Sequence, residues 1–336
     1  MSAPAVESSR GAPRASAAPL VGIVVPTWNR AADAARCLAS LAALTYARRR
    51  AIVVDNGSRP SERAALRAAL ADAMTRADAA ARADATTLVE LPENRGFAAG
   101  VNAGLAAAFA AGCDAVLVLN DDAEVDPGLL EALLAAAAAD PVAGIVAPRV
   151  VDTASGAEVS RGERVSLPLL CLPRTWLRVR GGGDAPRRVS GVLGVAFLVS
   201  RACYERVGPL AEPFFAYYEE VDYWLRVRAA GMAIVVVPAV RVRHRGFRGF
   251  AGGFTPLAAY LKARNLPLVL RRHGGIFDWL AFVPAYAALL AASAAGYALR
   301  GGGTTVIAAM LRGARDAWHG RGGPPPAELV PPAAAA

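Results

Sequence analysis

The chain has 336 residues and a formal net charge of +9; 55% of its residues are hydrophobic and 19% are charged. This apolar content excludes a disordered chain, and the four scattered cysteines, with no CxxC pair, exclude a disulfide scaffold. Lys262 is the sole lysine, so no glycine-rich loop ends in Gly-Lys-Ser/Thr and a P-loop NTPase is excluded. The length predicts one large domain, or one domain with an appendage.

Both ends of the chain have low complexity. Residues 1–19 are rich in Ser, Ala, Pro and Arg and lack the apolar run of a secretory signal, so we expect a disordered leader. Residues 321–336 are rich in proline and alanine, and we expect a disordered tail.

Short apolar strands alternate with Ala/Leu-rich helices through the first half of the chain. We expect strands at 20–25, 51–54, 87–91 and 115–119. We expect helices at 31–44, 61–79, 97–111 and 127–139, the last capped by Asp126 with Pro127 at its first position. This alternation predicts a parallel sheet covered on both faces.

The second half is less regular. Gly181–Gly183 marks a loop, after which we expect a buried strand at 189–200, a helix at 219–230 and a strand at 233–237. After Gly253 the pattern indicates only long helices.

Each early strand ends in a polar cluster. The clusters are PTWNR at 26–30, DNGS at 55–58, ENRG at 93–96 and NDD at 120–122. Because ligands of open α/β sheets bind at the carboxyl ends of the strands, the four clusters together outline one site. Any one of them alone is equally typical of a turn.

The clusters also indicate what this site binds. PTWNR contains no glycine, which argues against a dinucleotide-binding GxGxxG motif and against a hydride-transfer enzyme. The carboxylates of the NDD cluster suit Mg²⁺ or Mn²⁺ held partly by the phosphates of a substrate.

Six segments stand in order along the chain: PTWNR, VVDNGS, ENRGFAAGVNAG, LNDDAEV, FFAYYEEVDYWLR and VRH. Together they resemble the family 2 glycosyltransferases, and more narrowly their bacterial rhamnosyltransferase-like branch. The resemblance runs from about Val21 to His244, with weaker similarity at 260–265 and 311–323. It implies an α/β fold of the GT-A type, with a mostly parallel central sheet flanked by helices, here followed by a helical C-terminal extension. It also implies a nucleotide-diphosphate sugar donor, a divalent metal and inversion at the anomeric carbon.

This resemblance divides the chain into a catalytic domain at 20–250 and a helical region at 251–320, a candidate for membrane association. Within the catalytic domain it assigns 20–125 to nucleotide binding and 126–250 to the acceptor side.

The resemblance places the donor pocket at the ends of the first two strands. Asp55 matches the base-binding aspartate of the family, which accepts a hydrogen bond from the pyrimidine ring. Pro26, Thr27 and Asn29 would line the same nucleoside pocket.

Two further segments match the diphosphate and metal side. Asn94 and Arg95 match a segment near the nucleotide, where Arg95 is either a counter-charge for the diphosphate or an ordinary surface arginine. Asn120 replaces the first aspartate of the family's DxD motif. The resemblance therefore makes Asp122 the first metal ligand and Asp121 a partner on the ribose or phosphate side.

Inverting transfer needs a carboxylate that accepts the proton of the attacking hydroxyl. Glu220 falls where the family has this general base, although carboxylates at a helix start also suit the helix dipole. Glu219 and Asp222 are candidates for binding acceptor hydroxyls. Trp224 is a candidate for stacking on a sugar ring, with packing in the core as the alternative.

His244 matches a family histidine that completes the metal site, and neutral imidazole is a suitable ligand for Mn²⁺. His273 and His319 have no such motif around them. Gly191–Phe197 matches the strand before the acceptor site, where glycine allows a substrate to approach the backbone closely.

The C-terminal region combines an apolar run with basic charge. Trp279–Leu299 has 21 residues without a charge, and it could span a membrane, lie in its interface or pack on the domain. Residues 241–321 hold 12 Lys+Arg against two acidic residues, whereas the rest is nearly neutral. We therefore expect a cytoplasmic protein in peripheral contact with an anionic membrane at its inner face. No nucleic-acid-binding module is visible.

These features predict an inverting glycosyltransferase that depends on Mn²⁺ or Mg²⁺ and acts on a glycan or lipid-linked acceptor. A dTDP-rhamnose donor is expected from the family branch, and UDP-galactose or another pyrimidine-linked donor fits the same motifs. A sugar nucleotidyltransferase is a weaker alternative, because it would need a glycine-rich basic loop in place of PTWNR. A catalytically degenerate glycan- or nucleotide-binding protein on the same fold is the other alternative, suggested by Asn120 and Glu220.

Overall fold

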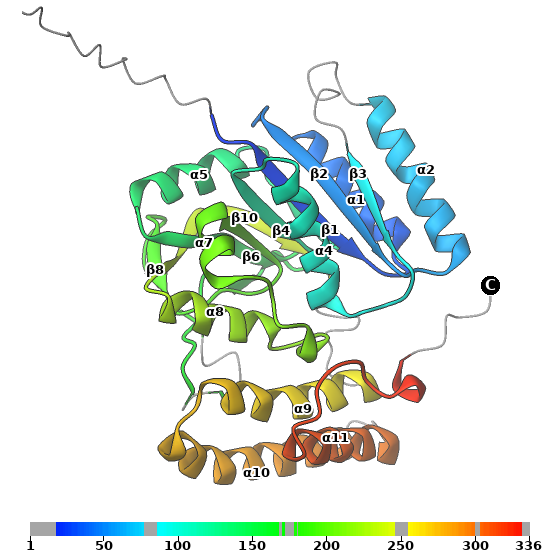
Figure 1. Ribbon diagram of the computed structural model, residues 1–336, viewed down its shortest axis with the longest axis vertical. Helices are drawn as coiled ribbons and strands as arrows, with labels where there is room; N and C mark the ends of the chain where they lie inside the picture. The colour runs from blue at the N-terminus through cyan, green and yellow to red at the C-terminus, as the bar shows by residue number, and fades with distance from the viewer. Residues whose placement is uncertain are drawn as a thin grey trace, which may run out of the picture.

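The computed structural model of the protein describes residues 18–76, 86–167, 170–171, 178–179, 181–245, 255–299 and 303–330. An α/β body forms most of it, and three C-terminal helices lie together along one side of that body (Figure 1). The leader predicted at 1–19 falls almost entirely outside the described residues.

One sheet of ten strands runs through the body in the order β3-β2-β1-β4-β9-β6-β10-β5, with β7 beside β6 and β8 beside β10. The strands are β1 (Val21–Thr27), β2 (Arg49–Asn56), β3 (Thr87–Leu91), β4 (Ala115–Leu119), β5 (Ala123–Val125), β6 (Ala143–Asp152), β7 (Glu158–Ser160), β8 (Arg187–Val189), β9 (Ala196–Ser200) and β10 (Ala233–His244). The first four in sheet order are parallel, and so are β6 and β10, whereas β9 runs antiparallel between β4 and β6. The prediction of a mostly parallel central sheet is confirmed.

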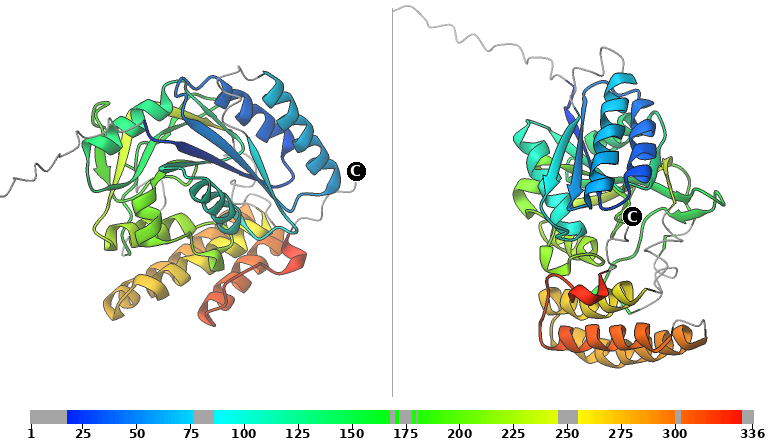
Figure 2. Two further views of the ribbon diagram at one scale, coloured as in Figure 1. Left: turned by 45° about the horizontal axis from the view of Figure 1, so that its top comes forward. Right: turned by 90° about the vertical axis from the view of Figure 1, so that its right-hand side faces the viewer.

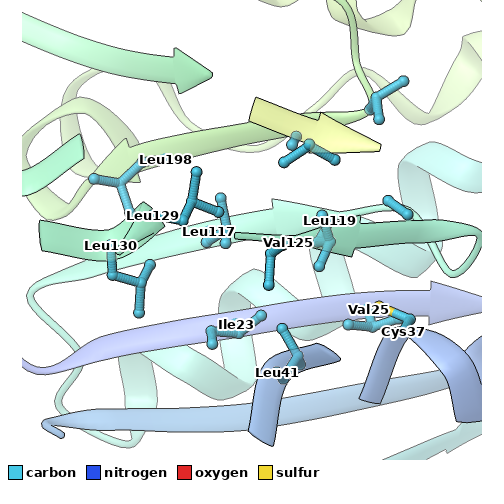
Figure 3. Packing of buried hydrophobic residues seen from close by; sticks show 14 of the residues in the cluster. Ile23, Val25, Cys37, Leu41, Leu117, Leu119, Val125, Leu129, Leu130 and Leu198 are labelled. Atoms are coloured by element: carbon cyan, nitrogen blue, oxygen red, sulfur yellow. The ribbon is translucent and has the colours of Figure 1, made fainter. Parts of the chain in front are cut away.

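Helices cover both faces of this sheet, as predicted. In the body they are α1 (Ala31–Ala42), α2 (Pro60–Arg76), α4 (Phe97–Ala110), α5 (Leu129–Ala139), α7 (Arg201–Val207) and α8 (Glu219–Ala229), with the 3-10 turn η2 (Glu212–Phe214) before α8. Successive side chains of a strand point to opposite faces. Ile23 therefore packs with Leu41 and Leu129 on the face of α1 and α5 (Figure 3), while Val24 packs with Leu105 of α4 on the other face.

The register of the parallel strands brings their carboxyl ends to one edge. Thr27 at the end of β1 lies opposite Asp55 of β2, and Asn56 at the end of β2 lies opposite Leu91 of β3. The polar clusters that follow these strands therefore gather at this edge, which is where the sequence placed the site.

The segment predicted as one strand at 189–200 is interrupted between β8 and β9, so that prediction is wrong for 190–195. β8 ends at Val189 and β9 begins at Ala196. The connection between them passes close to α8, because a Cβ on Gly191 would lie 2.9 Å from the ring of Trp224 and one on Gly194 would lie 3.5 Å from Glu220. The glycines thus let this segment pack against the helix instead of continuing a strand.

Other elements also differ from the prediction. Helix α5 begins at Leu129 and has Gly128 before it, because the Asp126 carboxylate pairs with Arg243 at 2.8 Å instead of capping the helix. Strand β6 was not predicted at all. Its sequence contains Pro148, a residue disfavoured inside a sheet, and this weakens the strand signal.

The C-terminal helices are α9 (Pro256–His273), α10 (Ile276–Leu299) and α11 (Gly303–Trp318). Helix α9 lies between the body and the other two (Figures 1 and 2). Helix α11 packs closely on α9 at Gly313, where an added Cβ would lie 2.2 Å from the carbonyl oxygen of Tyr260. The prediction of long helices after Gly253 is confirmed for the described residues.

Helix α10 is, within the described part of the chain, the one helix long and apolar enough to cross a membrane by length and composition. Its bulky side chains lie on both faces. Trp279, Phe282 and Tyr286 pack on the body and α9, and Tyr297 packs on α9 and α11. Ile276, Phe277 and Leu280 near its start are exposed, and the exposed face beyond them is mostly alanine. Of the three arrangements considered for this run, packing on the domain agrees with these contacts.

The tail folds back onto the body for part of its length. The carbonyl oxygen of Gly323 accepts a hydrogen bond from Arg264 at 2.6 Å, and Arg321 lies 3.3 Å from Asp316. A short 3-10 turn, η5 (Ala327–Leu329), follows. The predicted disordered tail is therefore wrong for 321–330, while 331–336 lie outside the described residues.

Candidate active site

The NDD cluster lies in the turn between β4 and β5, next to the end of β10. The pairing of β10 with β5 places His244 opposite Ala123, and His244 Nε2 lies 2.9 Å from Asp122 Oδ1. Arg30, from the turn after β1, approaches the other oxygen of Asp122 at 3.1 Å. Asp122 and His244 are both buried. The fold thus brings together the two residues predicted as metal ligands.

Asp121 is buried in the same cluster but in different electrostatic surroundings. Its Oδ2 accepts a hydrogen bond from Thr27 at 2.8 Å, and its Oδ1 lies 3.4 Å from Arg30 Nη1. Burial raises the pKa of the Asp121 carboxyl to about 7, although the positive charge of Arg30 acts to lower it. Burial acts on Asp122 in the same direction, but the hydrogen bond and charge of His244, together with Arg30, lower its pKa. Two carboxylates share one guanidinium here, so the cluster can accept a further cation.

The cluster can be tested for its fit to a divalent metal. Among the described residues, no group of three or more His, Cys, Asp or Glu side chains is arranged to hold a metal by itself. Asp122 and His244 offer an oxygen and a nitrogen 2.9 Å apart, and the shielded Oδ1 of Asn120 has no hydrogen-bond partner. This donor set fits Mn²⁺ or Mg²⁺ that completes its coordination with phosphate oxygens and water.

Asp55 and Asn29 hold the two turns beside this cluster. The fully buried Asp55 carboxylate accepts the N–H of Ser58 at 3.0 Å and pairs with Arg63 Nε at 2.7 Å. Asn29 accepts the N–H of Arg59 at 2.9 Å and donates its own N–H to Ser58 at 2.8 Å. The structure therefore places both predicted residues at the same edge and shows them fixing the loops around it.

Asn56 is a site residue that the sequence did not single out. Its amide nitrogen donates to Gly96 O at 2.8 Å and to Asn94 Oδ1 at 3.3 Å, and its oxygen accepts the N–H of Arg95 at 3.1 Å. It therefore ties the end of β2 to the ENRG turn. The exposed Arg95 side chain lies 3.0 Å from Glu212 of η2. The only sequence signal for Asn56 was its place inside the DNGS cluster.

Glu219 and Glu220 open helix α8, and both are buried. The residues before them form a loop with unusual backbone angles. Phe215, Tyr217 and Tyr218 have positive φ values of 64°, 68° and 70°. Burial and the charges of the two glutamates raise the pKa of the Tyr217 hydroxyl, which places it in their electrostatic field.

A short segment connects Glu220 to the NDD cluster. A Cβ on Gly194 would lie 3.5 Å from Glu220, and the next residue, Val195, accepts the N–H of Asn120 at 2.9 Å. Glu220 and the NDD cluster therefore flank the same two residues.

Asp222 differs from its predicted role. It is fully buried, 2.6 Å from Arg272 Nε and 2.8 Å from both His273 and Arg226. Burial acts to raise the pKa of Asp222, but His273, Arg226 and Arg272 together lower it to about 2. The prediction that Asp222 binds acceptor hydroxyls is wrong, because its buried carboxylate is enclosed by two arginines and His273, which join α8 to α9.

Trp224 is also a core residue, so the prediction that it stacks on a sugar ring is wrong. Its side chain is fully buried, Nε1 donates to Val192 O at 2.9 Å, and its ring packs edge-on against Phe197 at 5.0 Å. The alternative of aromatic core packing is the one the structure shows.

A family model described as glycosyl transferase family 2 matches residues 22–206, which is more than half of the chain. The chain belongs to this family. The matched region of this glycosyltransferase contains the polar clusters at the ends of the parallel strands and stops before Glu219 and His244.

A curated relative supports the branch that the motifs indicated. The N-acetylglucosaminyl-diphospho-decaprenol L-rhamnosyltransferase of Mycobacterium tuberculosis is 27% identical to this glycosyltransferase over 286 residues, covering 75% of this chain and 85% of the relative.

Solved structures show the same GT-A fold. The mannosyltransferase PcManGT from Pyrobaculum calidifontis, in complex with GDP-Man and Mn2+, is 20% identical with a TM-score of 0.55, covering 90% of this chain and 88% of the other. GalNAc-T7 with UDP, GalNAc and Mn2+ is 16% identical with a TM-score of 0.52. Its match covers 68% of this chain and 43% of GalNAc-T7.

Proposed function

We propose that this glycosyltransferase is inverting and metal-dependent, and that it transfers a sugar from a nucleotide diphosphate to a hydroxyl of a lipid-linked or cell-surface glycan. One observation carries the proposal: two acidic centres adjoin at one edge of the sheet. Asp122 with His244 forms the first and Glu220 the second, and both flank the Gly194–Val195 segment. Inverting transfer needs such a pair, one centre for the leaving diphosphate and one for the proton of the attacking hydroxyl.

The proposed donor pocket lies at the ends of β1, β2 and β3. Asp55 holds the nucleotide base, with Pro26, Thr27 and Asn29 around it. This assignment is supported by the place of Asp55 opposite Thr27 at the carboxyl ends of β2 and β1, and by the bonds that tie Asn29 to the turn after β2. Asp121 faces the ribose or phosphate side.

The diphosphate side is assigned to the NDD cluster and the ENRG turn. Asn94 and Arg95 lie in a turn whose geometry Asn56 fixes. A bound Mn²⁺ or Mg²⁺, held by Asp122 and His244, would offset the charge of the leaving diphosphate.

Glu220 is the proposed general base. Its carboxylate accepts the proton as the acceptor oxygen forms a bond to the anomeric carbon, while the bond from that carbon to the diphosphate breaks. A single displacement of this kind inverts the anomeric configuration. Glu219, buried beside it, is proposed to hold the acceptor hydroxyl.

The substrates are proposed from the curated relative, whose name describes rhamnosyl transfer to a glycan on decaprenol diphosphate. We propose dTDP-rhamnose as donor and a polyprenyl-diphosphate-linked sugar as acceptor.

The experiment mixes the protein, Mn²⁺ and a panel of nucleotide sugars, and measures the release of nucleotide diphosphate with and without a lipid-linked acceptor. Asp122→Ala should abolish metal-dependent donor binding. Glu220→Gln should lower transfer by at least about 100-fold, since it removes the proton acceptor, while donor affinity survives. Glu219→Gln is the matched control and should mainly raise the acceptor KM. If no donor binds to the unaltered protein, the proposed function is wrong, and if Glu219→Gln is the variant that stops transfer, the two glutamates exchange roles.

A membrane contact is proposed for the side formed by α10 and α11. Ile276, Phe277 and Leu280 on α10 are 68%, 82% and 66% exposed, and Trp318 on α11 is 62% exposed. Trp318 also lines a surface pocket of about 450 Å³ together with Arg271 and Trp279. Exposed apolar and aromatic side chains next to arginines suit the interface of an anionic bilayer. This contact would hold the enzyme at the inner face of the cell membrane.

A further inference from the structure

Two buried residues of α9 contact the loop that leads into Glu219 and Glu220. Arg264 and Asn265 are both fully buried. They lie in the segment YLKARN at 260–265, which none of the roles assigned above uses. Burying a guanidinium and an amide costs free energy unless their N–H donors are satisfied. The hydrogen-bond partners of Arg264 and Asn265 therefore indicate the role of these two residues.

Asn265 donates to three backbone carbonyls of this loop. Its Nδ2 lies 2.8 Å from each of the carbonyl oxygens of Phe214, Ala216 and Tyr217. Two N–H groups thus serve three acceptors within four successive residues. No other side chain described in the structure makes as many bonds to this loop, and the contact fixes the course of its backbone.

Arg264 completes the contact and locks the orientation of Asn265. Its Nε donates to Asn265 Oδ1 at 2.9 Å, which determines which end of the amide faces the loop. Its Nη2 donates to Phe214 O at 2.9 Å, and its Nη1 donates to Gly323 O at 2.6 Å. The loop is therefore held between α9 and the tail.

The loop needs this support because its backbone is strained. Non-glycine residues rarely adopt positive φ, and such angles persist only where the surroundings impose them. Phe215, Tyr217 and Tyr218 all adopt them, and Tyr218 is the residue that precedes the first turn of α8. On the opposite side Gly96 contacts the loop so closely that a Cβ there would lie 2.4 Å from Phe215 O.

We propose that Arg264 and Asn265 are positioning residues for the acceptor-side carboxylates. They hold the 213–218 loop in its strained course, and the loop sets the direction in which Glu219 and Glu220 leave the first turn of α8. Helix α9 is then needed for the geometry of the catalytic centre. This inference rests on the proposed function of the two glutamates.

The test replaces Asn265 with Asp, which keeps its size and one oxygen but removes both donors to the loop. Transfer kcat should fall by about 100-fold, as expected when a reacting group is displaced by about 1 Å. Donor affinity should stay within about threefold of the unaltered enzyme, because the Asp55 and Asp122 centres are held by other contacts. Hydrogen exchange of the 213–220 amides should rise, while that of β1 and β4 should not.

Met310→Ala is the matched control. Met310 is buried between α9 and α11 and belongs to a cluster that contains no residue of the loop. This variant should lower the Tm, but kcat should not fall relative to donor affinity. If Asn265→Asp does not fold, Asn265→Ser, which retains one donor, is used instead. Its kcat should fall by a smaller factor, and its donor affinity should again be retained.

The proposal is overturned if folded Asn265→Asp or Asn265→Ser transfers sugar at the unaltered rate, or if donor affinity falls in parallel with kcat. Both outcomes require that the unaltered enzyme binds its donor. If the unaltered enzyme binds no donor, the proposed function has failed, and exchange of the 213–220 amides still decides whether Asn265 holds the loop.

Discussion

Asp222 shows how a single carboxylate can be taken out of a predicted binding site. It lies two positions after Glu220 in the acidic segment, but Arg226, Arg272 and His273 of α8 and α9 enclose it. At a helix start, residues two apart point in different directions. Glu220 lies against Gly194, whereas Asp222 faces α9.

This arrangement predicts a specific dependence of stability on pH. The pKa of Asp222 in the folded protein is about 2, below its value of about 3.9 in an unfolded chain. Its contribution is therefore complete above about pH 4 and is lost as the pH falls through 2, an amount of about 2.6 kcal/mol. The free energy of unfolding of Asp222→Asn, measured with urea from pH 6 to pH 2, should lack this loss.

Asp222→Asn should also be less stable at pH 7 by about 3 kcal/mol, because it removes the buried carboxylate that pairs with Arg226 and Arg272. Asp140→Asn is the control, since Asp140 pairs with the exposed Arg188 and should change stability little. A variant at Asp222 that loses stability with acid as steeply as the unaltered protein contradicts this account.

The residues that could be predicted from the sequence are those whose roles follow from strand ends and motif positions. Asp122, His244 and Glu220 were chosen in that way, and the structure brings them to one edge of the sheet. Arg30 was not assigned a role, because only the fold places it between Asp121 and Asp122.

At the scale of helices and strands, periodic patterns predicted the parallel half of the sheet well and the mixed half poorly. The strands from β1 to β4 alternate with helices and match the expected ranges closely. Strand β6 escaped prediction, since Pro148 weakens its strand signal, and the apolar run at 189–200 was predicted as one strand although only β9 and the last residue of β8 lie in it. Their places are fixed by contacts with distant strands and with α8.

The contact between α9 and α11 makes a prediction about two glycines in helices. In α11, a Cβ on Gly313 would lie 2.2 Å from Tyr260 O, so Gly313→Ala should force the helices apart and destabilise the protein by about 1–3 kcal/mol. In α10, nothing lies within 4 Å of a Cβ on Gly296. Gly296→Ala should therefore stabilise by about 0.5–1 kcal/mol through helix propensity alone.

Thermal unfolding of the two variants measures both effects. The Tm should fall for Gly313→Ala and rise slightly for Gly296→Ala. Equal shifts in one direction would show that the close approach at Gly313 does not limit the packing.

For the molecule as a whole, the three C-terminal helices have one side against the α/β body and one side outward (Figure 2). The sequence predicted helices and basic charge here, but not which face points outward. Trp279, Phe282 and Tyr286 of α10 pack against α9 and the body. Inward packing of this kind depends on contacts between distant residues, so the periodicity of one helix could not reveal it.

The outward apolar residues of α10 allow the proposed membrane contact to be tested. The double variant Phe277→Glu with Leu280→Glu should lower binding to vesicles that contain an anionic phospholipid by at least about tenfold, because it adds negative charge and removes apolar contact. Sedimentation with vesicles measures the bound fraction. Val142→Glu, at an exposed position of the α/β body between α5 and β6, is the control. Binding that is the same for the double variant and the unaltered protein would exclude this surface.

The hydrogen bond from Arg264 to the carbonyl of Gly323 has a consequence for biosynthesis. A ribosome makes the chain in order, so the nucleotide-binding strands and both acidic centres emerge long before residue 323. The growing chain can fold its sheet and occupy its donor pocket, but the loop before Glu219 lacks the support of Gly323 until that residue has left the exit tunnel. Full sugar transfer would therefore begin only after residue 323 has emerged, even though the chemistry-bearing residues were made earlier.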